Sequence, residues 1–459
     1  MRRIAVAVAL WLAAAGPSAA TGFIALSDLH LDPTSDPALV PELLAAEVSD
    51  WAEILERGQE GFGAFGRDAT WPLVRSALDQ MRAVAPEPAF LLLTGDLLAH
   101  GFRAKFAAAA PGAEEGVYDT FVVKTVAFLA GEIRRRFVSQ RVFVALGNND
   151  DFCGDYMLTP DGAFLDATEP LVQDLLALED AGSFAQDWDR GYGYDLPNGA
   201  IAGLRMIFLN SIFFAPGYDE ACAAAAPTDP GLAAMDWLAG RLEAARAAGE
   251  RVWLFVHIPP GADAYATVRH GACPDGLRAM WTAPETERFL GLMQRYSGTV
   301  SATFAGHTHM DEFRLLGTAD AAGFVLVIPG ISPIFGQNPG FQIYEADHQG
   351  RISDRDTWAL TNLEAIGDGG APAWRREYRF SARWGLPGVD ATTLATLAAR
   401  IAADPATRAA WYAVFRVGRT AAWDRAGGVA SLPEAEFAAY HCAMTAVAPD
   451  TYRRCLCGG

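Results

Sequence analysis

Short runs of consecutive apolar residues recur along the first half of the chain, and polar residues follow each run at once. The runs are Phe23–Leu26, Ala89–Leu93, Val142–Leu146, Met206–Leu209 and Val252–Val256. Runs of this length without apolar–polar alternation are typical of strands buried on both faces. They predict a central sheet whose strands end in polar loops.

Longer segments between these runs place apolar residues at helical spacing. The predicted helices are Trp71–Val84, Val122–Arg136, Ala233–Ala248 and Pro284–Tyr296. Strands that alternate with helices predict an α/β fold. In such folds the functional side chains commonly lie on the loops that leave the strand ends.

The first twenty residues differ from the rest of the chain. Arg2 and Arg3 precede an apolar run, Ile4–Ala15, and small residues follow it at Ser18–Ala20. This order is typical of a secretory signal peptide, and the run is too short to cross a bilayer. We therefore expect segment 1–20 to be cleaved and the protein to be periplasmic or secreted, with no stable membrane anchor.

The C-terminal part of the chain has a different pattern. Short strands and turns are expected over 324–358, Gly367–Pro372 is interpreted as a linker, and helical spacing is expected from Ala373 onward. We predict a catalytic domain over 21–365 and a helical C-terminal region with a cysteine cluster over 366–459.

Charge and cysteine content limit the partners and the compartment. The net charge of −19 argues against a nucleic-acid duplex as partner, since that would need a basic surface. We expect a small substrate and a monomer or weak oligomer.

The six cysteines suit an oxidising compartment. We expect Cys222 to pair with Cys273, Cys442 to pair with Cys455 or Cys457, and Cys153 to be a free or buried thiol.

Histidine and aspartate residues follow several predicted strands. Asp28 and His30 share one face because they are two residues apart, and His307 and His309 repeat this spacing. Two divalent ions about 3.5–4 Å apart can clamp a phosphate and hold a hydroxide for in-line attack. One carboxylate must bridge such ions, and Asp96 is the candidate.

Five motifs occur in order along the chain. They are Asp28-x-His30, Gly95-Asp96, Gly147-Asn148-Asn149-Asp150, His257 and Gly306-His307-Thr308-His309. The set resembles the calcineurin-like metallophosphoesterases, and longer matches such as Val256–Gly261 resemble the acid sphingomyelinase-like phosphodiesterases. The resemblance implies a two-sheet β-sandwich flanked by helices.

The resemblance also implies two sets of metal ligands. Asp28, His30, Asp96 and His309 would bind one ion, and Asp96, Asn148, His257 and His307 would bind the other. We expect zinc, with manganese or iron as alternatives.

One position departs from the family pattern. The family usually has a histidine where this chain has Asn149, and that histidine is placed to protonate the leaving oxygen. Gly-Asn-Asn-Asp also occurs in endopolyphosphatase-like relatives. The remaining candidate acid is His100, whose charge Asp150 or the metals could tune. The alternative for His100 is an ordinary hydrogen-bonding role.

The sequence therefore predicts a hydrolase of phosphodiester or phosphoanhydride bonds in nucleotides or phospho-alcohol esters, with a hydroxide between two ions as nucleophile. Three alternatives stay open: a phosphomonoesterase with the same metals, an endopolyphosphatase, and a non-catalytic metal- or ligand-binding homologue, which Asn149 would suggest.

Overall fold

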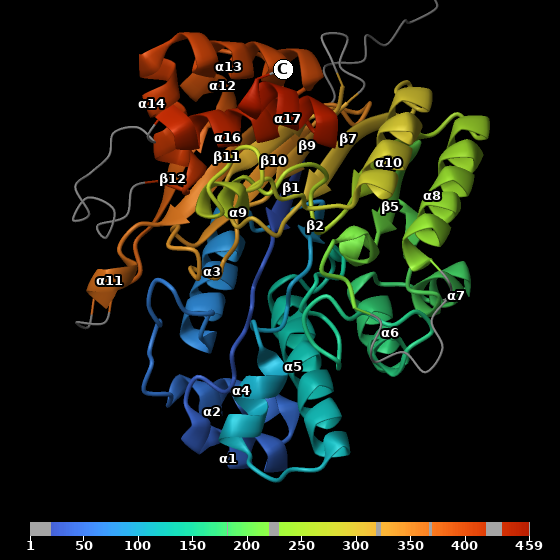
Figure 1. The fold of residues 1–459 in the computed structure, drawn as a ribbon. Helices are drawn as coiled ribbons and strands as arrows, with labels where there is room; N and C mark the ends of the chain where they lie inside the picture. Colours follow the sequence, from blue (N-terminus) through green and yellow to red (C-terminus); the bar gives the residue numbers. More distant parts are fainter. Residues whose placement is uncertain are drawn as a thin grey trace, which may run out of the picture.

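Two six-stranded sheets face one another, and helices cover their outer faces (Figure 1). The computed structural model describes residues 20–180, 182–219, 229–317, 323–366, 370–418 and 434–458. The predicted signal peptide therefore lies almost wholly outside the described residues.

The first sheet has the strand order β12-β11-β10-β1-β2-β3. Its strands are β1 (Thr21–Leu26), β2 (Phe90–Leu93), β3 (Arg141–Val144), β10 (Gly340–Ala346), β11 (Ile352–Leu360) and β12 (Trp374–Arg379). Strands β1, β2 and β3 run parallel, with Ile24 opposite Leu91 and Leu92 opposite Phe143. The other pairs are antiparallel. The loops after β1, β2 and β3 consequently leave the same edge of the sheet.

The second sheet has the order β4-β5-β6-β7-β9-β8. Its strands are β4 (Gly193–Pro197), β5 (Leu204–Leu209), β6 (Arg251–Phe255), β7 (Val300–Ala305), β8 (Glu312–Leu315) and β9 (Phe324–Val327). Strands β5, β6, β7 and β9 are parallel, and the edge strands β4 and β8 are antiparallel to their neighbours. All five predicted strands are confirmed, as β1, β2, β3, β5 and β6.

Aromatic side chains fill the space between the sheets. Phe23 on β1 stacks on Phe90 of β2 at 4.7 Å between ring centroids and lies 5.1 Å from Trp253 of β6. Phe143 on β3 stacks on Phe208 of β5 at 5.9 Å. These rings are buried, so the apolar runs of the sequence form the shared core that fixes the two sheets relative to each other.

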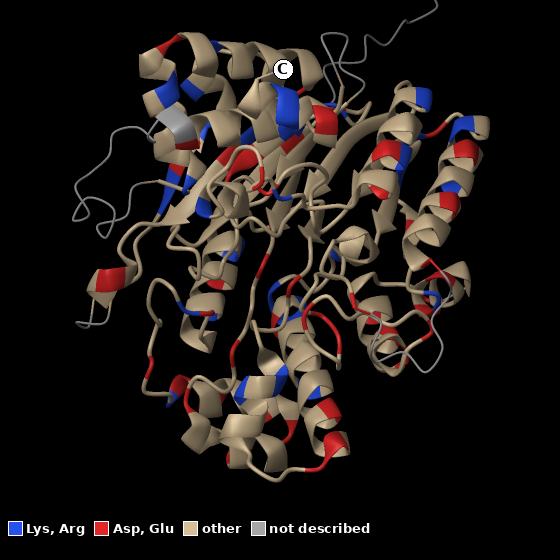
Figure 2. Ribbon diagram, viewed as in Figure 1, with Lys and Arg blue, Asp and Glu red and all other residues tan. Residues whose placement is uncertain are grey.

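Helices surround both sheets. Those of the first half are α1 (Val40–Ala45), α2 (Trp51–Glu56), α3 (Trp71–Val84), α4 (Phe102–Ala109), α5 (Glu115–Arg136), α6 (Ala163–Leu175) and α7 (Gly182–Asp189), with 3-10 turns η1 (Pro37–Leu39), η2 (Val48–Asp50) and η3 (Ser211–Phe214). Those of the second half are α8 (Pro230–Ala247), α9 (Ala264–Arg269), α10 (Ala283–Arg295), α11 (Leu363–Ile366), α12 (Phe380–Trp384), α13 (Ala391–Ala403), α14 (Pro405–Phe415), α16 (Glu434–Thr445) and α17 (Pro449–Cys457). The four predicted helices are confirmed as α3, α5, α8 and α10. Lys and Arg are interspersed with Asp and Glu on α8 and α10 (Figure 2), as expected for helices with one solvated face.

The expectation of helix from Ala373 onward is wrong for its first residues. Residues 374–379 form β12, which pairs with β11 at the edge of the first sheet. Arg375 and Arg376 are exposed and Tyr378 is buried, which suits an edge strand, where charged side chains discourage further pairing. The remaining described C-terminal elements are helical, and α13 and α16 pack against β8.

Two disulfides hold helix α17: one joins it to the loop after α9, and the other joins it to α16. Cys273 is bonded to Cys457, and Cys442 is bonded to Cys455. The expected Cys222–Cys273 pair is therefore wrong, because the loop after α9 lies against α17; Cys222 itself lies outside the described residues. Pairing of Cys442 with Cys455 is confirmed. Cys153 is disulfide-bonded, so the expectation of a free or buried thiol is also wrong.

No helix within the described ranges combines the length and the apolar character that a membrane crossing requires.

Candidate metal centre

The predicted ligands lie on the loops that leave the parallel strands, and many have unusual backbone angles. Asp28, His30, Asp96, His307 and His309 have φ values of 51°, 40°, 57°, 73° and 61°. They are five of the ten non-glycine residues with positive φ among those described. Residues with strained backbone angles cluster at functional sites, because the surrounding structure must hold them in a conformation that is unfavourable by itself.

Asp96 lies between histidines of the two predicted ligand sets. Its Oδ2 is 3.3 Å from His30 Nε2 and 3.1 Å from His257 Nε2. All three side chains are buried. One carboxylate oxygen is thus shared between residues that come from different sheets.

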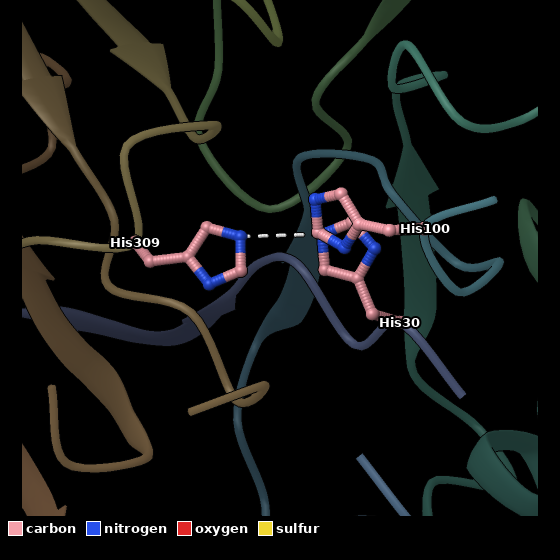
Figure 3. Close-up of side chains that lie close together, drawn as sticks. All are labelled: His30, His100 and His309. Atoms are coloured by element: carbon pink, nitrogen blue, oxygen red, sulfur yellow. Dashed lines mark hydrogen bonds between the residues drawn. The ribbon is translucent and has the colours of Figure 1, made fainter. Parts of the chain in front are cut away.

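His30 and His309 face one another across the site (Figure 3). Their Nε2 atoms are 3.2 Å apart, and His309 Nε2 is 3.4 Å from Asp28 Oδ1. His30 Nδ1 lies 2.8 Å from the Leu98 carbonyl, and His309 Nδ1 lies 2.9 Å from the Ser332 carbonyl. A carbonyl only accepts, so both Nδ1 atoms carry a proton, and the Nε2 atoms are the ones directed into the site.

The second half of the site shows the same arrangement. His257 Nδ1 donates to the Thr94 carbonyl at 2.7 Å, and its Nε2 lies 3.1 Å from Asn148 Oδ1. Asn148 Nδ2 donates to Asp155 Oδ1 at 2.5 Å, which fixes the orientation of the amide. A divalent cation that displaces the Nε2 proton of His257 would meet two acceptors at this point, His257 Nε2 and Asn148 Oδ1.

His307 is the remaining residue of the second predicted ligand set. Ligand atoms of Asp96, His257 and His307 all lie within 4.8 Å of one another, as do those of Asp28, His30 and Asp96. Imidazole nitrogens and carboxylate oxygens in this mixture suit divalent transition ions. Hydrogen bonds from ring Nδ1 atoms to carbonyls are the outer contacts that orient such ligands. The residues present fit two divalent ions.

Asp150 organises the loops that carry these ligands. It accepts hydrogen bonds from the backbone N–H groups of Asp96 at 2.9 Å, Leu97 at 2.8 Å and Gly147 at 2.9 Å. The expected tuning of His100 by Asp150 gains no support, because Asp150 faces the backbone of the loops after β2 and β3.

Two glycines allow these loops to approach closely. A Cβ at Gly147 would collide with the Asp96 carboxylate, and a Cβ at Gly95 would lie 2.5 Å from the Gly147 backbone nitrogen. Gly95 also has a φ of 103°. Side chains at either position would push apart the loops that bring Asp96 and Asn148 together.

Asn149 supports the shared carboxylate. Its backbone N–H donates to Asp96 Oδ1 at 2.8 Å, and its side-chain Nδ2 donates to Asp96 Oδ2 at 3.1 Å. Asn149 therefore orients Asp96, a role that the sequence did not reveal.

His100 is held beside the site by Asp68. His100 Nδ1 donates to Asp68 Oδ1 at 2.8 Å, and its backbone N–H donates to Asp68 Oδ2 at 3.0 Å. Lys105 contacts the same carboxylate at 2.6 Å. The His100 ring stacks on His30 with centroids 4.0 Å apart (Figure 3). Asp68 thus orients His100, a contact that the five motifs did not predict; the signal available in the sequence was an acidic residue close to Gly66.

Burial and the nearby carboxylates have opposite effects on the pKa values of the histidines. Burial lowers the pKa of His30 and of His257, but nearby carboxylates, Asp96 first and then Asp28, raise each pKa to about 9. Burial dominates at the other two, and lowers the pKa of His307 to about 3 and that of His309 to about 4. Without a metal, protons on His30 and His257 thus compensate the buried carboxylates.

Metal loading should therefore displace protons from His30 and His257. Both are protonated below their pKa of about 9, so zinc must compete with protons at neutral pH and binds more weakly as the pH falls. We expect metal-free protein to release about two more protons per chain on zinc binding at about pH 8 than at about pH 10. Calorimetry in buffers of different ionisation enthalpy measures this, and equal release at both pH values would refute it.

A cavity of about 260 Å³ opens onto the candidate metal centre. Residues from distant parts of the chain line it, including His100, Asn148, His307, Phe335, Phe415 and Tyr440. The C-terminal region thus forms part of the wall above the ligands. A cavity of this size suits a small molecule.

The fold and the cluster of acceptor ligands define a metal-dependent hydrolase class, and comparison with known proteins identifies the family. The family model described as calcineurin-like phosphoesterase matches residues 22–311. The chain belongs to the calcineurin-like phosphoesterase family, whose members are hydrolases that use divalent metal ions. The resemblance inferred from the five motifs is confirmed.

The curated relatives support the same branch. Acid sphingomyelinase-like phosphodiesterase 3b of Homo sapiens is 28% identical over 450 residues, which cover 94% of this chain and 89% of the relative. Cyclic GMP-AMP phosphodiesterase SMPDL3A of Bos taurus is 26% identical, with 85% of this chain and 82% of the relative covered. Among solved structures, a dimetal phosphatase from Danio rerio matches with a TM-score of 0.41 and 12% identity over 74% of this chain and 96% of that one.

Proposed function

We propose that this chain is a phosphodiesterase with a dinuclear metal site at Asp96. The observation that carries the proposal is the Asp96 carboxylate oxygen, which lies 3.3 Å from His30 Nε2 and 3.1 Å from His257 Nε2. A carboxylate in this position can bridge two cations that would otherwise repel each other. We propose zinc for both ions, because imidazole is its common ligand, with manganese or iron as alternatives.

Two bound divalent ions would screen the charge of a phosphate group and lower the pKa of a water molecule that attacks it. The chain's own residues position these components. Asn149 and the backbone bonds of Asp150 hold the shared carboxylate, while the cavity admits the ester beside His307 and Asn148.

We propose His100 as the group that protonates the leaving oxygen. Asp68 holds the proton on His100 Nδ1, so His100 Nε2 is the atom that can carry the transferable proton. Asn149 cannot serve, since its amide has no titratable proton near neutral pH. The pair His100–Asp68 stands beside the metal ligands and lines the cavity.

The proposed substrates are small phosphodiesters or phosphoanhydrides of the nucleotide or phospho-alcohol type. The relatives are named phosphodiesterases, one of them for cyclic GMP-AMP, which favours diesters over monoesters. Disulfides and the signal-like N-terminus support a periplasmic or secreted protein.

Two chromogenic substrates separate the diesterase from a monoesterase with the same metals. We expect zinc- or manganese-loaded protein to hydrolyse bis-p-nitrophenyl phosphate with a higher kcat/KM than p-nitrophenyl phosphate, and a chelator to abolish both reactions. The reverse preference would favour a phosphomonoesterase. Stoichiometric metal without turnover of either substrate would favour a non-catalytic homologue.

A further inference from the structure

Two exposed aromatic rings stand at the mouth of the catalytic cavity. Tyr265 is 46% exposed and Phe335 is 39% exposed, and both line the cavity. Their ring centroids are 6.2 Å apart. Within the described part of the chain, three other large hydrophobic residues are more than a third exposed, and none of them lines the cavity: Val117, Val138 and Leu232.

Phe335 lies on a loop that backbone hydrogen bonds hold in place. Its loop between β9 and β10 contains a turn closed by Gly336 N–H to the Pro333 carbonyl at 3.0 Å, and Gly66 N–H donates to the same carbonyl at 3.1 Å. The ring meets that of His309 edge-on at 4.8 Å. A ring left in water on a fixed loop gains none of the free energy that burial supplies, so its apolar surface is available to a ligand.

Tyr265 is held by the C-terminal helices. It lies on α9, which packs against α16, and the loop after α9 is bonded through Cys273 to Cys457 of α17. The Arg269 guanidinium lies over its ring at 5.3 Å and donates to its hydroxyl. The ring is therefore fixed in direction.

We propose that Phe335 and Tyr265 form a subsite for the nucleobase of the substrate, and this rests on the proposed phosphodiesterase function. Stacking on aromatic rings suits bases of any sequence, because every base has a flat π-face. The ring of Phe335 lies against His309, so a base stacked there belongs to a molecule whose phosphate reaches the metal ligands.

The charges of the cavity argue against a polyphosphate chain. Three carboxylates, those of Asp155, Asp263 and Glu312, line it beside two arginines, Arg314 and Arg416, so the lining has no excess of positive charge for an extended polyanion. The polar groups of the lining can form hydrogen bonds to the edges of a planar base, and the two aromatic rings can stack on its face.

Competitive inhibition tests the subsite. Bis-p-nitrophenyl phosphate turnover by the full chain is inhibited with adenosine monophosphate or with inorganic phosphate, and the inhibition constants Ki are compared. Phe335→Ala and Tyr265→Ala are each expected to raise Ki for adenosine monophosphate about 10-fold and to leave Ki for inorganic phosphate unchanged. Phe335→Tyr keeps a ring and should preserve both constants, which separates lost stacking from misfolding. Val138→Ala, at an exposed apolar residue outside the cavity, is the matched control.

The outcomes separate the two proposals. Unchanged Ki for adenosine monophosphate in both alanine variants, or an equal rise for both inhibitors, would overturn the nucleobase subsite while the metal-dependent turnover stands. Absence of metal-dependent turnover in the unsubstituted protein would refute the proposed function and the subsite together.

Discussion

Replacing Asp96 with asparagine is expected to lower kcat/KM for a phosphodiester by about a thousand-fold or more and to reduce bound metal. Asparagine keeps the shape of the side chain but removes the charge that lies between His30 and His257. Without that charge, two neighbouring cations lose the group that offsets their repulsion. Kinetics with bis-p-nitrophenyl phosphate and metal content by mass spectrometry measure both effects.

Asp354→Asn is the matched control for this variant. Asp354 is also a buried aspartate with a cationic partner, Arg379 at 2.8 Å, but it lies on β11 outside the candidate metal centre. We expect Asp354→Asn to keep both the metal content and kcat, whatever it does to stability. An Asp96→Asn protein that retained its metal and full activity would contradict the role proposed for Asp96.

Replacing His100 with alanine is expected to have an effect that depends on the leaving group. For a nucleoside phosphate methyl ester, whose alkoxide needs a proton to depart, we expect kcat to fall about 100-fold. For bis-p-nitrophenyl phosphate, whose phenolate leaves without protonation, we expect little change. Steady-state kinetics of both substrates give the comparison.

His270→Ala is the control for this variant, because His270 is an exposed histidine whose Nδ1 contacts the Ala266 carbonyl on α9. It should leave both substrates unaffected. Equal losses on both substrates in His100→Ala would point to a structural role for His100 and away from proton donation.

Much of the fold could be predicted because buried parallel strands leave a strong local pattern. The runs Phe23–Leu26 and Val252–Val256 contain almost no polar residue, since both faces of β1 and β6 are covered. The strand β12 was missed for the opposite reason. It is a charged edge strand, and only its pairing with β11 makes it extended, which no local pattern reveals.

The candidate ligands could be predicted because each one lies directly after a strand, next to glycine or at a spacing of two residues. The contacts around these ligands could not be predicted. Asp68 reaches His100 from 32 positions earlier in the chain, and Cys273 reaches Cys457 across 184 positions. Phe335 carries no signal in the sequence, because its importance lies in its exposure beside His309. Such contacts depend on tertiary packing, which periodicity does not encode.

Anomalous X-ray diffraction from crystals of the metal-loaded protein, measured at the absorption edge of the bound metal, tests the shared carboxylate most directly. We expect two peaks about 3.5–4 Å apart, with Asp96 in contact with both. The first should also contact His30 and His309, and the second should contact His257 and His307. A single peak, or two peaks of which Asp96 touches at most one, would contradict it.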